Sequence, residues 1–283
     1  PDKESSSGRK FLRWLGDSGF LIALVLIGSF YVIMLLAMLA ADVTWTSPSH
    51  LLAALASDEI QYSIRLSLMS CTVAAILSVW VAVPIGYLMS RFNFFGKGVV
   101  DAILDIPIVL PPLVVGLSLL ILFHTTAGVW VEDTFRAVFG TGITYQIPSV
   151  VLAQFMVACA FAVRTMRATF DQISVRQEDV ALTLGCSRFQ AFWLVTLPEA
   201  RNGLITALTL AWARSLGEFG PILVFSGATR MKTEVLPTTV YLEMTTGSLE
   251  AAVAVSILMV VFAVGVLFTI RYFGSDRSLG RVI

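Results

Sequence analysis

Six long runs of apolar residues occur along the 283-residue chain. Each reaches the roughly 20 residues that a helix needs to cross about 30 Å of hydrocarbon at about 1.5 Å per residue. The first run is longer than the apolar core of a signal peptide, so we expect it to be retained as a span. The pattern predicts an all-α, polytopic membrane protein with six transmembrane helices. The runs cover residues 20–41, 66–90, 99–123, 149–168, 201–226 and 250–272.

Composition and charge agree with a membrane setting. Hydrophobic residues make up 57% of the chain and charged residues 13%, against about 25% charged in a soluble domain. Lys and Arg collect on the cytoplasmic side of membranes. Segments 1–19, 91–98, 164–201 and 271–283 hold fourteen of them, whereas the opposite loops hold three, namely Arg136, Arg230 and Lys232.

This bias predicts that both termini are cytoplasmic, although the formal net charge is zero. We expect a cytoplasmic tail over residues 1–19, a six-span domain over 20–272 and a second cytoplasmic tail over 273–283. The basic residues then serve topology in the lipid bilayer, and no nucleic-acid partner is needed to account for them.

Several kinds of chemistry lack a sequence signature. Cys71 and Cys159 fall within spans and Cys186 in a cytoplasmic loop, so we expect packing residues and not disulfides. Only His50 and His124 are present, without a Cys/His cluster, so we expect no metal site. The phosphate-loop pattern Gly-x-x-x-x-Gly-Lys-Ser/Thr is absent. We therefore expect no enzyme activity and no cofactor bound by this chain.

The longest cytoplasmic loop, at residues 173–198, has the marks of two short helices. Two Ser-x-x-Gln pairs fit the capping box, in which hydroxyl and amide satisfy free N–H groups at a helix start. Gly185 lies between the two segments, where a left-handed residue would end the first helix. Pro198 follows the second and suits the first turn of the next span. The two pairs are Ser174 with Gln177 and Ser187 with Gln190.

One interpretation of this loop is an amphipathic helix pair on the membrane surface. Leu184, Phe189, Phe192 and Trp193 would then dip into lipid.

The spacing within the loop favours a different interpretation. It resembles the cytoplasmic coupling motif of ATP-binding-cassette importer permeases, which reads Glu-Ala-Ala, three residues, Gly, nine residues, Ile, one residue, Leu-Pro. Every interval is preserved here, with Asp for Glu, Val for the first Ala and Val for Ile. The coupling residues assigned on this resemblance are Glu178, Asp179, Ala181, Gly185, Val195, Leu197 and Pro198.

The resemblance also implies partners. In that family the loop docks into a groove on a separate ATPase subunit, which binds ATP and Mg. It implies two cytoplasmic ATPase subunits, an extracytoplasmic substrate-binding protein and a location in the prokaryotic inner membrane. One six-span bundle is too small to enclose a gated path, so we expect a second permease copy. A homodimer is the prediction, with a paralogous partner left open.

A second resemblance concerns the fifth predicted span. The stretch Ala213–Gly220, ARSLGEFG, is similar to the fifth-span signature of the molybdate, tungstate and sulfate permease branch. With the spans and the coupling loop, the likeness extends over roughly residues 60–272, and the tail 1–19 lies outside it.

Arg214 and Glu218 lie inside this span, about 20 Å from its start. A charge at that depth costs roughly 2.5 to 3.5 kcal/mol or more, so it faces protein or a watery cavity. The two residues stand four apart on one helix face and could form a structural ion pair at a bend. The alternative places Arg214 on the translocation path, where it would attract an anion.

The third predicted span has a matching irregularity. Pro107, Pro111 and Pro112 free backbone carbonyls, which is tolerable at depth only against protein or a watery cavity. We expect the third and fifth spans to meet around the pathway, with a simple packing kink as the alternative. Asp101 and Asp105 are candidates for pairing with cytoplasmic Arg residues. The predicted path or gate residues are Pro111, Pro112, Arg214, Ser215, Gly217, Glu218, Gly220 and Pro221.

These features predict the transmembrane subunit of an ATP-driven importer for molybdate or tungstate. A permease for sulfate or thiosulfate is the nearest alternative, and one for another small solute is more distant. A secondary transporter that needs no ATPase is the rival from another class. Such proteins often show repeated halves or a buried proton relay, and neither is evident here.

Overall fold

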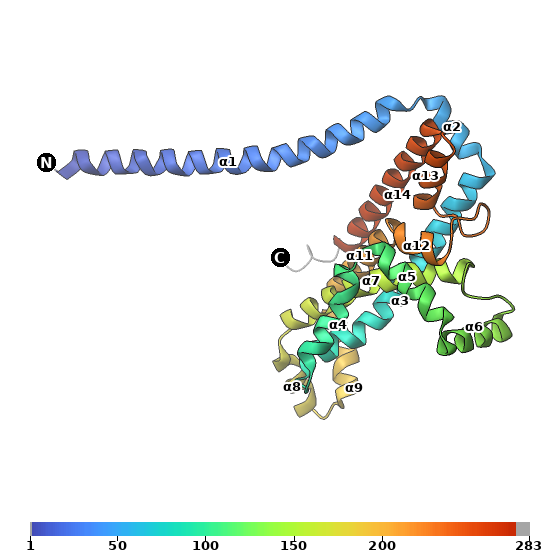
Figure 1. Cartoon of the computed structure of the whole chain (residues 1–283). Helices are drawn as coiled ribbons and strands as arrows, with labels where there is room; N and C mark the ends of the chain where they lie inside the picture. The colour runs from blue at the N-terminus through green and yellow to red at the C-terminus, as the bar shows by residue number, and fades with distance from the viewer. Residues whose placement is uncertain (1, 276–283) are drawn as a thin grey trace. The chain divides into compact units, whose positions relative to one another are not determined.

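The computed structural model describes the backbone of residues 2–275 and the side chains of residues 20–268 apart from 48 and 50. All regular structure in this range is helical (Figure 1). The side chain of His50 and residues 276–283 of the predicted second tail lie outside the described part.

The helices follow one another with short connections, and several are only one or two turns long. Their bounds are α1 Asp2–Trp45, α2 Pro48–Ala56, α3 Asp58–Arg91, α4 Lys97–Val109, α5 Pro112–His124, α6 Thr126–Phe139, α7 Ile147–Gln172, α8 Val175–Thr183, α9 Arg188–Ala191, the π-helix η1 Phe192–Thr196, α10 Leu197–Glu199, α11 Arg201–Leu216, α12 Gly220–Phe225, α13 Leu236–Thr245 and α14 Leu249–Ser275.

The chain divides into two units, Pro1–His50 and Leu51–Ile283. The first unit consists mainly of α1. Its part Phe20–Trp45 is long and apolar enough to cross a membrane and buries none of its side chains within the structure. Apolar side chains without protein cover at this length are typical of a helix surrounded by lipid or by another chain. The first predicted span is therefore present as a continuous helix.

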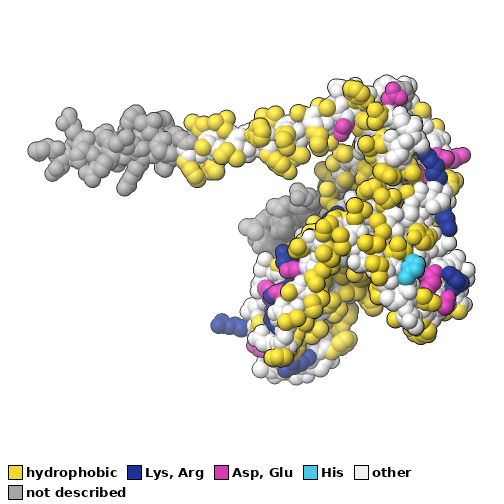
Figure 2. Space-filling view, in the orientation of Figure 1, with side chains coloured by type: hydrophobic (Ala, Val, Ile, Leu, Met, Phe, Trp, Pro, Cys, Tyr) yellow, Lys and Arg dark blue, Asp and Glu magenta, His cyan; other side chains and the backbone are white. Residues whose placement is uncertain are grey.

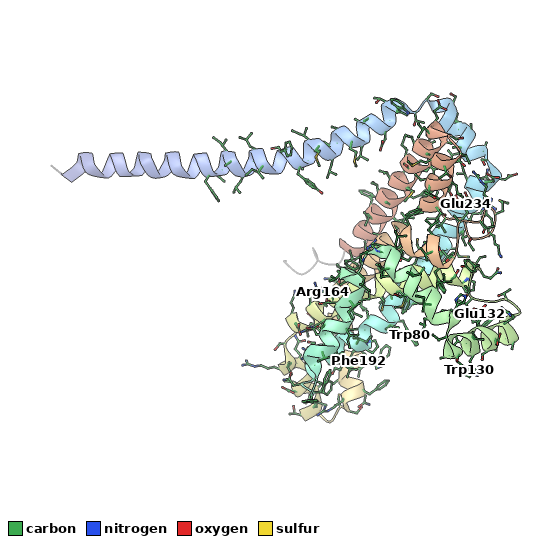
Figure 3. All side chains as sticks on the ribbon, in the orientation of Figure 1. Trp80, Trp130, Glu132, Arg164, Phe192 and Glu234 are labelled. Atoms are coloured by element: carbon green, nitrogen blue, oxygen red, sulfur yellow. The ribbon has the colours of Figure 1, made fainter. Side chains whose placement is uncertain are left out.

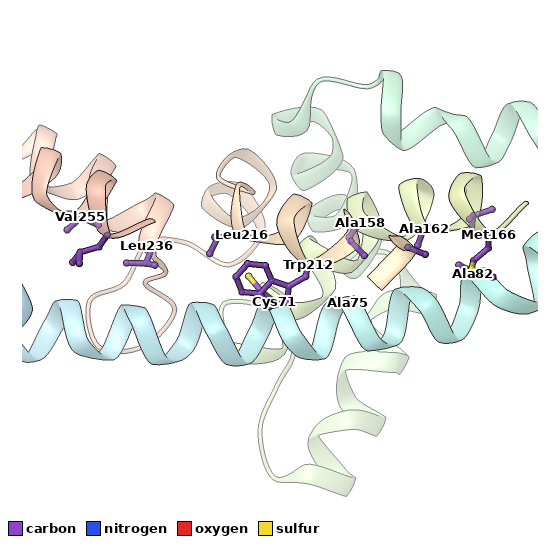
Figure 4. Close-up of a cluster of buried hydrophobic side chains, with 14 of the residues drawn as sticks. Cys71, Ala75, Ala82, Ala158, Ala162, Met166, Trp212, Leu216, Leu236 and Val255 are labelled. Carbon is purple, nitrogen blue, oxygen red and sulfur yellow. The ribbon is translucent and has the colours of Figure 1, made fainter. Parts of the chain in front are cut away.

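The core of the second unit lies between α3, α7 and α11. Small residues line the contact, so the helix backbones approach closely, as is usual for helices that pack in membranes. Figure 4 shows Cys71, Ala75 and Ala82 of α3 beside Ala158 and Ala162 of α7, all of them buried. This tight pack fixes the relative positions of the three helices that carry the candidate site.

Trp212 of α11 belongs to the same core. Its ring packs among the buried residues, and its indole N–H donates to the Thr72 hydroxyl on α3 at 3.3 Å. An aromatic ring with a satisfied polar end is well suited to an apolar interior.

Two predicted spans are broken. The third consists of α4 and α5, which meet at 111° across a break next to Pro111. The fifth consists of α11 and the short α12, separated by Gly217–Phe219. In the described range, four helices pass as continuous candidate spans, namely parts of α1, α3, α7 and α14, and the bent α4–α5 pair brings the number to five. Within the described residues, four whole helices and the bent pair account for up to five spans, while the run 201–226 is divided between α11 and the short α12 and does not pass, so the number six stays a prediction.

The two breaks lie against each other. A Cβ atom on Gly116 of α5 would fall 2.7 Å from the Pro221 Cα, and one on Gly220 would fall 3.0 Å from the Leu113 amide nitrogen. Such distances permit only glycine, because a Cβ would collide with backbone and not with a movable side chain. The third and fifth spans therefore meet, as the proline and glycine pattern predicts.

Three helices outside the six runs, α2, α6 and α13, have no counterpart in the sequence prediction, and the longer two are α6 and α13. α6 begins at an N-cap formed by Thr125, whose side chain accepts from the Gly128 amide, and ends at Gly140 with φ of 75°. Its Trp130 is exposed, whereas Glu132 accepts from the backbone amides of Ile143 and Thr144 (Figure 3). α13 is the other. Both are short and amphipathic or mixed in polarity, so an apolar-run search misses them.

Apolar side chains also dominate the surface of the second unit in the view of Figure 2. Exposed Leu, Ile, Val and Phe residues recur along α3, α4, α5 and α14. A soluble protein rarely exposes apolar surface on this scale, so the surface suits contact with lipid.

The close crossing of α5 and α12 makes a testable prediction. Replacing Gly116 with Ala forces the Pro221 backbone away and should lower stability by about 1–3 kcal/mol, as overpacking does elsewhere. The measurement is thermal unfolding of the purified protein in detergent. Gly98 of α4 is the matched control, because a Cβ there meets nothing within 4 Å. A Gly116→Ala variant with the same melting temperature as the wild type and Gly98→Ala would contradict the close crossing of α5 and α12.

Candidate functional site

The loop at residues 173–198 forms two short helices joined by a tight turn at Gly185. The Cys186 amide donates to the Ala181 carbonyl and the Gly185 amide to the Leu182 carbonyl, each at 3.0 Å. These two bonds are a Schellman motif, and Gly185 supplies its left-handed residue with φ of 92°. The turn predicted at Gly185 is confirmed.

The two predicted capping boxes differ in outcome. Ser187 and Gln190 form theirs, with Ser187 Oγ accepting from the Gln190 amide and Gln190 Oε1 accepting from the Ser187 amide. Ser174 is the N-cap of α8, but its side chain makes no capping hydrogen bond, so the box predicted with Gln177 is wrong. The Ser-x-x-Gln pattern permits the bond and does not enforce it, because exposed side chains can bond water instead.

The residues of the coupling motif divide by exposure along these helices. Glu178 and Ala181 are buried against the bundle, whereas Asp179 and Pro198 are exposed. Val195 and Leu197 are half-buried. The motif residues are thus spread over α8, the turn at Gly185, η1 and α10, and the exposed ones are available to a partner.

Besides the exposed motif residues Asp179 and Pro198, the same loop carries a patch of apolar side chains. Val180, Leu184, Phe189 and Trp193 are all exposed. Phe192 is not part of it, because its ring packs edge-on against Tyr87 at 4.8 Å between centroids (Figure 3). Of the four side chains that the surface-helix interpretation would place in lipid, one is therefore committed to the protein.

Arg214 and Glu218 form an ion pair at the break of the fifth span. Arg214 Nη1 lies 2.6 Å from Glu218 Oε1, and the side chains are 31% and 1% exposed. That oxygen has no aligned hydrogen-bond donor, so the contact is an ion pair and not a well-directed hydrogen bond. The Arg214 guanidinium also lies 5.5 Å from the centre of the Phe161 ring on α7. Glu218 is enclosed, while one side of Arg214 remains open.

Gln154 of α7 makes a hydrogen bond at the same break of the fifth span. Its Nε2 donates to the Ser215 carbonyl at 3.3 Å, and the same carbonyl accepts from the Glu218 amide at 3.2 Å where α11 ends. Gln154 therefore ties α7 to the turn that follows α11. Sequence analysis did not single out Gln154, although a lone amide within the apolar run 149–168 is a usable signal. Ser215 itself is fully buried, and its hydroxyl has no described hydrogen-bond partner.

A polar groove runs between α7 and α11 at the end of the bundle that carries α8. Its volume is about 680 Å³. Its walls include Arg164, Thr165 and Thr169 of α7 and Asn202 and Thr206 of α11. Polar side chains along helices of a membrane bundle normally face protein or water, so this groove is a candidate aqueous entry.

Arg214 lies farther along α11 than the residues that line the groove. Asn202, Thr206, Leu210 and Arg214 follow at intervals of four along α11, so each lies about one turn beyond the one before it. Thr206 and Arg214 are separated by about 12 Å along that axis. Phe161, which stacks on Arg214, stands one turn from Arg164 and Thr165. Polar groups of the groove and the ion pair thus lie along the same two helices, with the apolar Leu210 and Phe161 between them.

The acidic residues of the third span pair as predicted. On α7, Arg164 donates a hydrogen bond to Asp105 of α4, and Arg167 donates one to Asp101 of α4. These pairs attach α4 to the helix that lines the groove.

A second charged cluster occupies the opposite end of the bundle. Arg230 contacts Glu59 at the start of α3 and donates to Glu243 of α13 at 2.8 Å. Glu234 nearby is fully buried. Burial raises the pKa of its carboxyl, an effect that the Thr239 hydroxyl and the Arg230 charge oppose. The segment between α12 and α13 is thus fastened to α3 by charge.

The predicted path residues form two neighbouring groups. Pro112, Gly220 and Pro221 lie at the α5–α12 crossing next to Pro111, and Arg214, Ser215, Gly217 and Glu218 lie at the break of the fifth span. Within the described residues, no group of three or more His, Cys, Asp or Glu side chains could hold a metal ion. Tyr87 and Arg91, which contact Glu178, are site residues that sequence analysis missed.

Comparison with known proteins gives a consistent result. Residues 82–278 match the family model for the binding-protein-dependent transport system inner membrane component. The chain is 28% identical to the sulfate transport system permease protein CysT of Escherichia coli, covering 91% of this chain and 90% of CysT. It is 32% identical to the molybdenum transport system permease protein ModB of Mycobacterium bovis, covering 83% and 87%.

The fold is similar to that of a solved transporter as well. A bacterial ABC transporter involved in the import of the acidic polysaccharide alginate aligns with a TM-score of 0.69 at 16% identity, covering 97% of this chain and 98% of that one. The relatives are membrane permease subunits, with ATP hydrolysis on a separate subunit. The family match over more than half of the chain and the apolar helices agree: this chain belongs to the ABC importer permeases, as an inner membrane component of a binding-protein-dependent transport system.

Proposed function

We propose that this permease forms the translocation path for a tetrahedral oxyanion, molybdate or tungstate, with sulfate as the nearest alternative. The observation that carries the proposal is Arg214. Its guanidinium is held at the break of the fifth span by a buried carboxylate, with about a third of the side chain exposed. A guanidinium has a planar fork of donors that suits oxyanions.

The polar groove supports a path that reaches this residue. Asn202 and Thr206 give hydrogen-bonding groups along α11 below Arg214. The broken third and fifth spans place backbone at the same depth, which in membrane transporters is typical of solute sites. Relatives named for sulfate and for molybdenum support an oxyanion. The fifth-span signature favours the molybdate and tungstate branch.

The exposed side of α8 and α9 supports docking to an ATPase. It combines an apolar patch, including Leu184 and Phe189, with the acidic Asp179. We propose two cytoplasmic ATPase subunits that bind ATP and Mg, a second copy of this permease and an extracytoplasmic binding protein. In this arrangement both termini and the α8–α9 pair are cytoplasmic.

The energetics require a driver. Moving a dianion inward against 100 mV costs roughly 4.6 kcal/mol, twice the cost for one charge. ATP hydrolysis on the partner subunits supplies it. A permease that accumulates the anion without an ATPase subunit would favour the rival secondary-transporter hypothesis.

The coupling turn can be tested at Gly185. Valine at φ of 92° is strained, costing roughly 1–2 kcal/mol or more for a branched residue. Gly185→Val should weaken co-purification of the ATPase subunits and lower uptake while membrane insertion stays normal. Gly185→Asn is the matched control, because Asn tolerates the left-handed region and should retain most assembly. Full ATPase binding and uptake in the valine variant would remove the turn from the coupling device.

Variants of the Arg214–Glu218 ion pair distinguish a structural role of the pair from a role in anion transport. Arg214→Ala leaves Glu218 buried without its partner and should destabilise the protein by about 3–5 kcal/mol. Adding Glu218→Ala should restore much of the thermal stability. If Arg214 serves the anion, the stable double variant should still lose most uptake. A double variant that transports at the wild-type rate would show that the pair is structural only.

The substrate class is tested by uptake. Vesicles that contain the permease, its ATPase subunits and the matching binding protein should accumulate molybdate or tungstate only when ATP is present. Sulfate accumulation alone would move the assignment to the nearest alternative. If the vesicles transport cations or neutral organic solutes and no oxyanion, the substrate proposal is wrong although the family assignment stands.

A further inference from the structure

Arg91, the last residue of α3, makes an unusually complete set of hydrogen bonds at the end of the bundle that carries α8. Its side chain is 7% exposed. Its Nε donates to Glu178 Oε1 at 2.8 Å, Nη1 to the Phe170 carbonyl at 2.8 Å and Nη2 to the Ile173 carbonyl at 2.9 Å. Nη1 also donates to the Ser90 hydroxyl at 3.2 Å. Three different segments therefore meet at one guanidinium.

Two of these acceptors belong to the end of α7. The last carbonyls of a helix have no partner within it, and a cation there is also favoured by the helix dipole. Arg91 satisfies the Phe170 carbonyl in the last turn and the Ile173 carbonyl just beyond it. Five residues earlier on α3, a Cβ on Gly86 would fall 2.9 Å from the Arg167 amide nitrogen of α7. The ends of α3 and α7 are thus held in a fixed relation.

The third acceptor belongs to the coupling helix. Glu178 lies on the buried side of α8, and both of its carboxylate oxygens are occupied. Oε1 accepts from Arg91, and Oε2 accepts from the Tyr87 hydroxyl at 2.9 Å. Tyr87 and Arg91 stand four apart on α3 and so present one face to α8.

Aromatic packing surrounds the carboxylate. The Tyr87 ring lies edge-on against Phe170 of α7 at 5.6 Å and against Phe192 at 4.8 Å between centroids. Phe192 begins the π-helix that follows α9. The second coupling helix therefore adjoins the same point. Low exposure strengthens each hydrogen bond and makes each one costly to lose.

We propose that Arg91 is a positioning residue that clamps the coupling helix α8 to the ends of α3 and α7. This inference rests on the proposed function, in which α8 docks the ATPase. A push on α8 is then delivered to α3 and α7 as one body, and α7 lines the polar groove. Without the clamp, α8 could still bind the ATPase but would move separately from the span helices.

The clamp requires the several N–H donors of the forked Arg91 guanidinium, and a positive charge alone is not enough. Arg presents five N–H groups in fixed geometry and here uses its three nitrogen atoms on three acceptors, two at the end of α7 and one on α8. Lys has one nitrogen and cannot reach all three acceptors. Arg91→Lys therefore keeps the positive charge beside Glu178 and removes the clamp. Tyr87→Phe is a milder variant that removes one hydrogen bond and keeps the ring.

The first measurement uses the purified permease and does not depend on transport. Hydrogen exchange of the backbone amides in α8 should become about tenfold faster in Arg91→Lys and change less in Tyr87→Phe, because charge-assisted bonds that restrain local opening are lost. Arg201→Ala is the matched control, since this exposed arginine begins α11 away from α8. Exchange in α8 that is unchanged in both variants would overturn the clamp, whatever the transport result.

The second measurement uses the full complex with its ATPase subunits and binding protein in vesicles. Both variants should co-purify with the ATPase subunits as the wild type does. The amount of oxyanion taken up per ATP hydrolysed should fall several-fold in Arg91→Lys and stay at the wild-type value in Arg201→Ala.

The outcomes distinguish the two hypotheses. If wild-type vesicles show no ATP-dependent uptake while α8 exchange responds as expected, the proposed function fails and the clamp stands. If uptake per ATP is unchanged in assembled Arg91→Lys and Tyr87→Phe, the coupling role is refuted. If Arg91→Lys does not assemble with the ATPase subunits, the amount of oxyanion taken up per ATP hydrolysed by Tyr87→Phe decides whether the coupling role stands. Loss of uptake only in proportion to lost assembly, in both variants, would reduce Arg91 to a folding role and overturn the inference.

Discussion

The architecture depends on one constraint, that backbone N–H and C=O groups within hydrocarbon must find partners inside the protein. Two predicted spans are interrupted at depth, and each interruption releases such groups. The crossing of α5 and α12, with Gly116 against Pro221, covers the start of α12 with protein, whereas Pro111 and Pro112 at the other break are exposed within this chain. Gln154 then donates to a carbonyl where α11 ends. The sites that weaken the helices as spans are the same sites that place a guanidinium inside the bundle.

The path and the coupling helices share their supporting elements. α7 supplies one wall of the polar groove, carries Phe161 beneath Arg214, and ends at the carbonyls that Arg91 holds. α3 packs along α7 through small residues and ends at Arg91 itself. Because this pack is close, displacement of the α7 end cannot be absorbed locally and must pass along the helix. ATPase binding at α8 and anion passage at Arg214 are thereby mechanically related in the proposed mechanism.

Much of this arrangement follows from sequence, and the remainder is missed for identifiable reasons. Run length predicts the continuous spans, and the prolines and glycines predict the breaks, because each acts through local backbone geometry. The turn at Gly185 and the capping box at Ser187 follow in the same way, whereas the bond predicted at Ser174 is absent. Arg91 and Gln154 were not predicted, because their roles arise from contacts across 79 and 61 residues of sequence. The helix α6 carries no long apolar run and was likewise missed.

The central claim is that the groove between α7 and α11 is an aqueous route toward Arg214. Its most direct measurement is the reaction of single cysteines with a charged, membrane-impermeant thiol reagent in the assembled transporter, with the native cysteines replaced. Thr206→Cys, on the groove wall, should react and be protected by the transported oxyanion. Val261→Cys, on the exposed apolar side of α14, should not react. Equal inertness of the two positions, or reaction at Thr206→Cys that no oxyanion slows, would contradict the account.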